Sequence, residues 1–240
     1  MKTTLRSPAI TALPPLLLIA VIGCGGDGDG ADAEAAGDPS SDSGINAILY
    51  YPDRLVETAP ETFQVRFETT AGDFIVDVTR AWAPRGADRL YNLVKNGYYD
   101  GVYFYRVMSG FMAQFGMHGE PQVQIRWSRA TIEDDSVVAS NTRGTVTYAK
   151  GGPNTRTTQL FINFGDNSGL DAQGFAPVGM VSEGMDVVDL IHSGYGNIEE
   201  LGGTGPRAYN ITSQGNAYLE ESFPDLDHIV TATVVLPAGG

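Results

Sequence analysis

Short apolar or alternating runs, each ended by glycine or a polar turn, restrict the fold of this chain more than any other feature. The first two are FQVRFE at residues 63–68 and FIVDV at residues 74–78, with a turn between them. Alternating apolar and polar residues around a short turn predict a β-hairpin. Further strands are expected at residues 102–107, 111–115, 144–149, 159–164, 178–181 and 229–236.

Only two stretches have the apolar spacing of an amphipathic helix. The first begins at Pro84 and ends at Asn96-Gly97, and the second spans residues 183–193 and ends at Gly194. Many short strands with two helices predict an all-β fold, a closed antiparallel barrel with the first helix over one mouth. The solvent side of that helix is expected to carry Arg85, Asp88, Arg89 and Lys95.

The N-terminus has the pattern of an export signal. Lys2 and Arg6 precede an apolar run at residues 16–22 that is too short to span a bilayer. The run ends in VIGC, which resembles the lipobox of bacterial lipoproteins, so residues 1–23 are expected to be a lipoprotein signal peptide and Cys24 the lipidated residue. The alternative is an ordinary signal peptide followed by an incidental cysteine. The lipoprotein interpretation places the protein in the cell envelope, on the periplasmic face in a Gram-negative cell.

Residues 24–46 are rich in Gly, Ala and Ser and contain six acidic residues but no Lys or Arg. Such a segment buries too little apolar surface to order itself, so an acidic flexible tether is expected. Residues 47–61 are interpreted as a lead-in packed on the folded domain at residues 62–240. Cys24 is the only cysteine, so no internal disulfide can form and the domain must rest on its core.

Residues 103–116, YFYRVMSGFMAQFG, contain a single charged side chain, Arg106. Strand alternation predicts that Phe104 and Arg106 share one face. Together with Phe111, Met112 and Gln114, Arg106 suggests an apolar pocket with one cation and one amide at its rim. The alternative is a surface arginine on an edge strand, with its stem over aromatic neighbours.

Three blocks carry a family resemblance: FYRVMSGFMAQFG at 104–116, GGPNTRTTQLFIN at 151–163 and LDAQGFAPVGMVSEGMDVV at 170–188. In this order they resemble the cyclophilin family of peptidyl-prolyl cis/trans isomerases, especially its bacterial members. The resemblance runs from about Phe63 to Val235. It implies a closed eight-stranded antiparallel β-barrel capped by a helix at each end, with the isomerase domain at 62–240.

The resemblance implies an enzyme that accelerates rotation about Xaa-Pro bonds in exported polypeptides. Such a rotation needs no nucleophile, metal or cofactor, and Arg106 would donate to the proline nitrogen as amide resonance is lost. Gln114 and Phe111 complete the expected catalytic set. For the apolar members of the site, the alternative is a plain core role. The expected substrate-binding residues are Met112, Ala149, Lys150, Gln159, Phe161, Leu170 and Phe175.

Three positions depart from the family pattern. Gly169 stands where many members have Trp, which puts tight cyclosporin binding in doubt. Lys150 replaces the usual Asn, which matters little if the contact is made by the main chain. Phe175 takes the usual His position after a one-residue insertion.

No other partner or metal is indicated. The net charge of −14 argues against nucleic acid. The acidic trio Glu133, Asp134 and Asp135 is interpreted as a solvated loop face; as a metal site it has poor ligand spacing and only His118 nearby. We expect a monomer that binds Xaa-Pro polypeptides and reaches the membrane through its lipid. Two alternatives remain, a proline-peptide binding or chaperone module with incidental turnover, and a structural envelope protein with a vestigial pocket.

Overall fold

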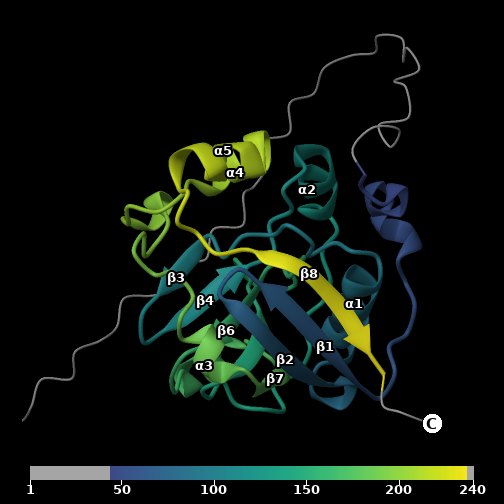
Figure 1. The fold of residues 1–240 in the computed structure, drawn as a ribbon. Helices are drawn as coiled ribbons and strands as arrows, with labels where there is room; N and C mark the ends of the chain where they lie inside the picture. The colour runs from purple at the N-terminus through teal and green to yellow at the C-terminus, as the bar shows by residue number, and fades with distance from the viewer. Residues whose placement is uncertain (1–43, 237–240) are drawn as a thin grey trace, which may run out of the picture.

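The computed structural model describes residues 44–236, and these form one curled antiparallel sheet with helices around it (Figure 1). The eight strands follow the order β3-β4-β6-β5-β7-β2-β1-β8. The predicted signal peptide, Cys24 and nearly all of the predicted tether lie outside the described residues. The strands are β1 (Thr62–Thr69), β2 (Gly72–Thr79), β3 (Arg106–Met108), β4 (Met112–Phe115), β5 (Thr145–Tyr148), β6 (Leu160–Asn163), β7 (Pro177–Glu183) and β8 (Ile229–Val235).

The prediction of eight antiparallel strands is confirmed, but the prediction of a closed barrel is wrong. β3 and β8 are the two ends of the sheet order, and no ladder joins them. The segment before β3 approaches the start of β8 through an isolated bridge between Tyr103 and His228. Backbone hydrogen bonds join Gly101 and Val102 to Ile229, and Phe104 to Asp227. β3 is three residues long, and its outer edge hydrogen-bonds through the Val107 N–H to the Gly196 carbonyl and not to β8, so the sheet remains a half-barrel.

The first predicted hairpin and the first predicted helix are confirmed. β1 and β2 pair from Thr62–Thr79 to Thr69–Gly72. The helix α1 begins at Pro84, which has no N–H to lose in a first turn, and ends at Lys95. The α-helices are α1 (Pro84–Lys95), α2 (Pro121–Trp127), α3 (Met185–Val188), α4 (Ala208–Gln214) and α5 (Asn216–Ser222); the 3-10 helices are η1 (Ala47–Tyr50), η2 (Pro52–Arg54), η3 (Arg80–Trp82), η4 (Ser168–Gln173) and η5 (Glu199–Leu201).

Helices are where the sequence prediction was weakest. The predicted helix at 183–193 is a single turn, α3, because β7 continues to Glu183. The segment 196–215 was predicted to be a loop, yet it contains η5 and α4. Helices α2 and α5 were not predicted, and each is only seven residues long. In Figure 1, α2, α4 and α5 lie beyond one end of the sheet and α3 lies beside β7.

The main core fills the concave face of the sheet. α1 packs Ala87, Leu90 and Leu93 into it, and the neighbouring strands add side chains such as Phe67 and Phe115. The lead-in also packs here, because Leu49 is buried and its carbonyl accepts a 2.8 Å hydrogen bond from the Trp127 indole. A fold without a disulfide therefore has a continuous apolar core.

Two predictions about side-chain direction in this region are wrong. Phe104 does not share a face with Arg106: it lies in the main core, because β3 begins only at Arg106 and strand alternation does not extend back to Phe104. Arg89 does not lie on a wet face of α1, because its guanidinium lies 5.0 Å from the Trp127 ring centroid and donates to the Ala130 carbonyl at 2.7 Å.

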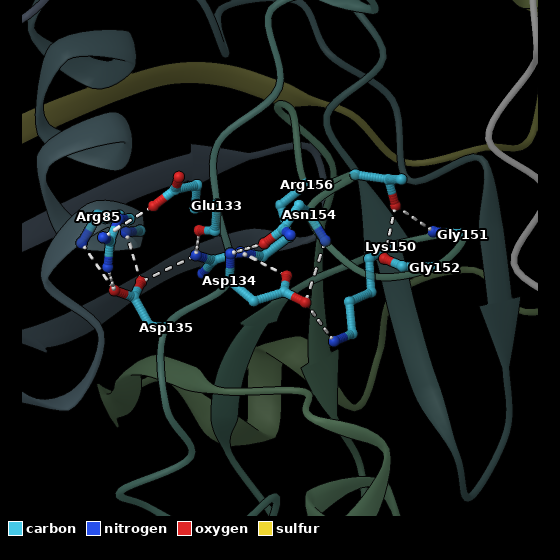
Figure 2. A network of polar contacts seen from close by, with 11 residues as sticks. Arg85, Glu133, Asp134, Asp135, Lys150, Gly151, Gly152, Asn154 and Arg156 are labelled. Carbon is cyan, nitrogen blue, oxygen red and sulfur yellow. Dashed lines mark hydrogen bonds and ion pairs between the residues drawn. The ribbon is translucent and has the colours of Figure 1, made fainter.

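The acidic trio is not a uniformly solvated loop face, and Figure 2 shows the polar contacts that its members make. Glu133 is exposed, but the Asp135 side chain is only 2% exposed. The Asp135 carboxylate accepts from the backbone N–H groups of Arg85 and Gly86, at 3.1 and 3.0 Å, and from the Arg156 guanidinium at 3.0 Å. Asp135 thus occupies the positive N-terminal end of α1 and compensates a buried cation.

His118 makes the stability of the domain sensitive to acid. It is 5% exposed, packs 5.0 Å from the Tyr98 ring centroid and accepts the Glu120 N–H on Nδ1 at 2.9 Å. Burial lowers its pKa to about 4. Its unfolded pKa is about 6.5, so the unfolded chain binds the proton first as the pH falls. The stabilisation is present above pH 6.5 and is lost between about pH 6.5 and 4.

We therefore expect His118→Asn to lose less stability than the native chain between pH 7 and pH 4. Asn keeps an acceptor for the N–H two residues ahead but does not titrate. Urea unfolding at both pH values measures the difference, which amounts to at most about 3 kcal/mol. An equal loss of unfolding free energy in both proteins would show that His118 is not the group responsible.

Candidate active site

The candidate site lies on the convex face of β3, β4 and β6. Alternation on β4 directs Ala113 and Phe115 into the main core, while Met112 and Gln114 point the other way. The register pairs Arg106 with Gln114 and Gln114 with Phe161. Gln114 is therefore a direct cross-strand neighbour of both other residues, although Phe161 lies 47 positions further along the chain.

Apolar side chains form a second cluster on this face, separate from the main core. Phe161 and Phe175 meet edge to face, with ring centroids 6.0 Å apart. Leu170 reaches the cluster from η4, which the sequence did not predict as a helix. The buried members are Met112, Ala149, Phe161, Leu170 and Phe175, with Met108 and Phe111 partly buried against them.

Arg106 is held beside this cluster by a chain of amides. Its Nη1 donates to Gln114 Oε1 at 2.9 Å, and Gln114 Nε2 donates to Gln159 Oε1 at 3.0 Å. The Tyr105 hydroxyl donates to the same Gln159 oxygen at 2.6 Å. These bonds fix the guanidinium from the side of the sheet.

A further contact fixes the guanidinium from the opposite direction. Arg106 Nε donates to Asn197 Oδ1 at 2.6 Å, and Nη2 approaches Met108 Sδ at 3.5 Å. Of the five N–H groups of a guanidinium, three have acceptors among the described residues.

The alternative of a surface arginine is wrong, because Arg106 lies on an edge strand but is only 2% exposed. Burial lowers the pKa of Arg106 from its usual value, and the neighbouring Tyr105 acts in the opposite direction. An arginine starts so far above neutrality that it stays protonated. The site therefore contains a permanent cation with little access to water.

Lys150 reaches the edge of the same cluster. Its ammonium lies 5.4 Å from the Phe175 ring centroid and pairs with Asp134 at 2.9 Å. The ion pair is visible in Figure 2. Beside it, the Ala149 N–H donates to the Gln159 carbonyl at 2.9 Å, in continuation of the β5–β6 pairing. Gly169 lies in η4 and faces open space, since a Cβ there would meet nothing within 4 Å.

All ten expected catalytic and substrate-binding residues therefore lie on one face, in the amide chain, in the apolar cluster or at its edge. Sequence reasoning missed Asn197, Tyr105 and Met108. Asn197 lies 91 positions from Arg106 in a glycine-rich segment, so no local pattern could indicate the contact. The contact of Met108 could have been predicted from the sequence, because Met108 is two residues from Arg106 and therefore on the same face of β3.

The described residues contain no group of three or more His, Cys, Asp or Glu side chains placed to hold a metal ion. Within residues 44–236, no helix has both the length and the apolar character needed to cross a bilayer.

Comparison with known proteins agrees with this geometry. Residues 64–211 match the cyclophilin type peptidyl-prolyl cis-trans isomerase/CLD family. A peptidyl-prolyl cis-trans isomerase of Acinetobacter baylyi is 37% identical over 133 residues, which cover 53% of this chain and 70% of that protein. Peptidyl-prolyl cis-trans isomerase B of Escherichia coli is 32% identical over 136 residues, covering 53% and 82%.

The fold has a counterpart among solved structures. A cyclophilin type peptidyl-prolyl cis-trans isomerase from Cryptosporidium parvum superposes with a TM-score of 0.54 at 18% identity, covering 73% of this chain and 99% of the other. That likeness concerns the fold alone, and the family match rests on sequence. This chain belongs to the family of cyclophilin type peptidyl-prolyl cis-trans isomerases.

Proposed function

We propose that this cyclophilin type peptidyl-prolyl cis-trans isomerase twists Xaa-Pro bonds without covalent chemistry, with Arg106 as the donor to the proline nitrogen. The observation that carries the proposal is a buried, permanently charged guanidinium held beside an apolar cluster. The substrates are polypeptides that contain proline.

The physics of the bond explains why this arrangement suffices. Amide resonance imposes a barrier of about 18–20 kcal/mol, whereas cis and trans forms differ by only about 0.5–1 kcal/mol before proline. When the bond twists, resonance is lost and the nitrogen regains a lone pair. A donor aimed at that lone pair stabilises the twisted state more than either planar state, and only such differential binding accelerates the reaction.

The apolar cluster supplies the binding partner for the proline ring. Phe161, Phe175 and Leu170 lie together on the same face as Arg106, and Phe111 packs partly buried against them. Gln114 holds the guanidinium, and its carbonyl oxygen is already engaged by Arg106. We therefore assign Gln114 to positioning and Arg106 to the transition state.

A direct test measures cis/trans relaxation of an Ala-Pro peptide in a protease-coupled assay with the purified protein. The proposal expects relaxation faster than in solvent, in proportion to protein concentration. Relaxation no faster than in solvent at micromolar protein would reject it.

The apolar cluster, which does not itself include Arg106, supports one alternative, a module that binds proline-containing segments with incidental turnover. The two functions separate in the Arg106→Ala variant. A binding module keeps its peptide affinity and its role in the cell when isomerisation is lost, whereas an enzyme loses its role with the rate.

We also propose that the protein acts at the cell envelope, anchored by a lipid on Cys24. The proposal is supported by the sequence of residues 1–24, with its basic start, short apolar run and lipobox-like VIGC. The tether of residues 24–46 would let the domain reach segments away from the membrane surface.

For the anchor, we expect Cys24→Ala to move the protein from the membrane fraction to the soluble fraction with its isomerase rate unchanged. Mass spectrometry of the native N-terminal peptide should show a diacylglyceryl group on the cysteine. An unmodified Cys24, or a membrane fraction unaffected by the substitution, would contradict the anchor and leave the enzymatic proposal standing.

A further inference from the structure

The segment from Tyr195 to Gly205 touches the candidate active site from outside the sheet. Its Gly196 carbonyl accepts a 3.2 Å hydrogen bond from the N–H of Val107, so the segment runs along the free edge of β3. Next to it, Asn197 Oδ1 accepts the 2.6 Å hydrogen bond from Arg106 Nε. This is the shortest of the three contacts made by the guanidinium, and it comes from a segment that contributes no side chain to the apolar cluster.

Asn197 is itself held firmly. Its Oδ1 also accepts the N–H of Ile198 at 3.1 Å, and its Nδ2 donates to the Leu201 carbonyl at 3.3 Å. The Gly205 N–H donates to the Asn197 carbonyl at 2.9 Å. Ile198 is buried in a satellite apolar cluster built with α4 and α5, so the segment is anchored on the side away from Arg106.

Glycine is required where this segment folds back on Asn197. A Cβ at Gly203 would overlap the Asn197 carbonyl oxygen, and a Cβ at Gly205 would lie 2.8 Å from the same atom. Only residues without a side chain let the backbone approach so closely. The backbone of the segment therefore folds closely around the backbone carbonyl of Asn197. The side-chain oxygen of the same residue, Oδ1, accepts the hydrogen bond from Arg106.

We infer that Asn197 is a positioning residue for the reaction: with Gln114 it fixes the plane of the Arg106 guanidinium so that a free N–H faces the proline nitrogen. The inference rests on the catalytic role proposed for Arg106. Two acceptors on different nitrogens, one from the sheet and one from the segment, prevent rotation of a planar group that a single acceptor would leave free. Orientation of this kind contributes to the rate and not to substrate affinity.

A role confined to the fold of the segment is the competing explanation, since Asn197 also bonds Ile198 and Leu201. The variant Asn197→Asp separates the two roles. Asp keeps an oxygen for Arg106 Nε but loses the donor to the Leu201 carbonyl, whereas Asn197→Ala loses both. Thr204→Ala is the matched control, because it removes another side-chain contact of the same segment, to the Tyr195 carbonyl at 3.3 Å, without touching Arg106.

The experiment measures kcat and KM for an Xaa-Pro peptide with each full-length variant, together with its melting temperature. We expect Asn197→Ala to lower kcat by about tenfold with KM nearly unchanged, less than the roughly 10²-fold cost of a 1 Å misplacement. Asn197→Asp should recover most of the rate, and Thr204→Ala should keep it. In the Arg106→Ala background, Asn197→Ala should have no further effect, because the group it positions is gone.

Each contrary outcome has a distinct meaning. A native kcat in Asn197→Ala, with Arg106→Ala inactive, would overturn this inference and leave the proposed function intact. Equal losses in Asn197→Ala and Asn197→Asp, or a loss that persists in the Arg106→Ala background, would assign Asn197 to the fold of the segment and also overturn it. A native rate in Arg106→Ala would instead refute the proposed catalytic role of Arg106.

Discussion

Replacing Arg106 with alanine should reduce kcat/KM for an Xaa-Pro peptide by about 10²–10³, the usual cost of removing a donor aimed at charge that develops in the transition state. The loss is expected because Arg106 is the charged group held at the apolar cluster by Gln114 and Asn197. Arg106→Lys should recover little of it. An ammonium is a point donor and cannot occupy two fixed acceptors while presenting further N–H groups in one plane.

Arg66→Ala is the matched control for this prediction. Arg66 is also a strand arginine, but it lies on β1, is about half exposed and pairs with Asp73 at 2.6 Å. Its substitution should leave kcat/KM unchanged. Circular dichroism and thermal melting establish whether each variant is folded. A folded Arg106→Ala protein with more than a tenth of the native kcat/KM would contradict the assignment of Arg106.

The largest effect on stability is expected at Asp135, which is not among the residues of the candidate active site. Asp135→Ala removes the acceptor for two N–H groups at the start of α1 and the 3.0 Å partner of Arg156, whose side chain is 2% exposed. Loss of one partner from a buried ion pair typically costs about 3–5 kcal/mol. We expect the lower end, because Asp134 remains 3.4 Å from Arg156 Nε. Urea unfolding at pH 7 measures the change in unfolding free energy.

Two further variants show whether the loss of unfolding free energy in Asp135→Ala comes from the buried ion pair. Glu133→Ala removes an adjacent carboxylate whose side chain is 72% exposed and pairs with Arg85, so it should cost less than about 1 kcal/mol. Asp135→Ala combined with Arg156→Met should be more stable than Asp135→Ala alone, since no unpaired buried charge is left. Similar losses in Asp135→Ala and Glu133→Ala would show that the buried network is not a major source of stability.

The sequence predicted most strands and the first helix well, because their signals are local; the exception is β3, which was predicted to begin at residue 102 and begins at Arg106. β1, β2 and α1 differ by at most a few residues from the predicted ranges, since alternation and a proline at the helix start act over a few positions. Closure of the barrel was predicted wrongly, because it depends on pairing between β3 and β8, which are distant in sequence and which no local pattern brings together. Short helices such as α2 and α5 are stabilised by packing and not by their own periodicity.

In the candidate site, too, local patterns could be predicted from the sequence and contacts between distant segments could not. Motif resemblance picked out the residues around Arg106 and the apolar cluster, which the sheet register brings together. It could not predict the burial of Arg156 and Asp135 or the reach of Asn197, because these depend on contacts between segments distant in sequence. A glycine-rich stretch such as residues 194–205 is predicted from sequence to be a loop, and only the structure shows that Gly203 and Gly205 pass close to the backbone carbonyl of Asn197.

The central claim is that Arg106 stabilises the twisted bond and does not serve merely to bind the peptide. The most direct test is NMR line-shape analysis of one Xaa-Pro peptide titrated with the native protein and with Arg106→Ala, because a single titration gives both the dissociation constant and the cis/trans exchange rate on the protein. We predict dissociation constants within about threefold of each other and an exchange rate at least about tenfold slower in the variant. An unchanged exchange rate, or a loss confined to the dissociation constant, would contradict the claim.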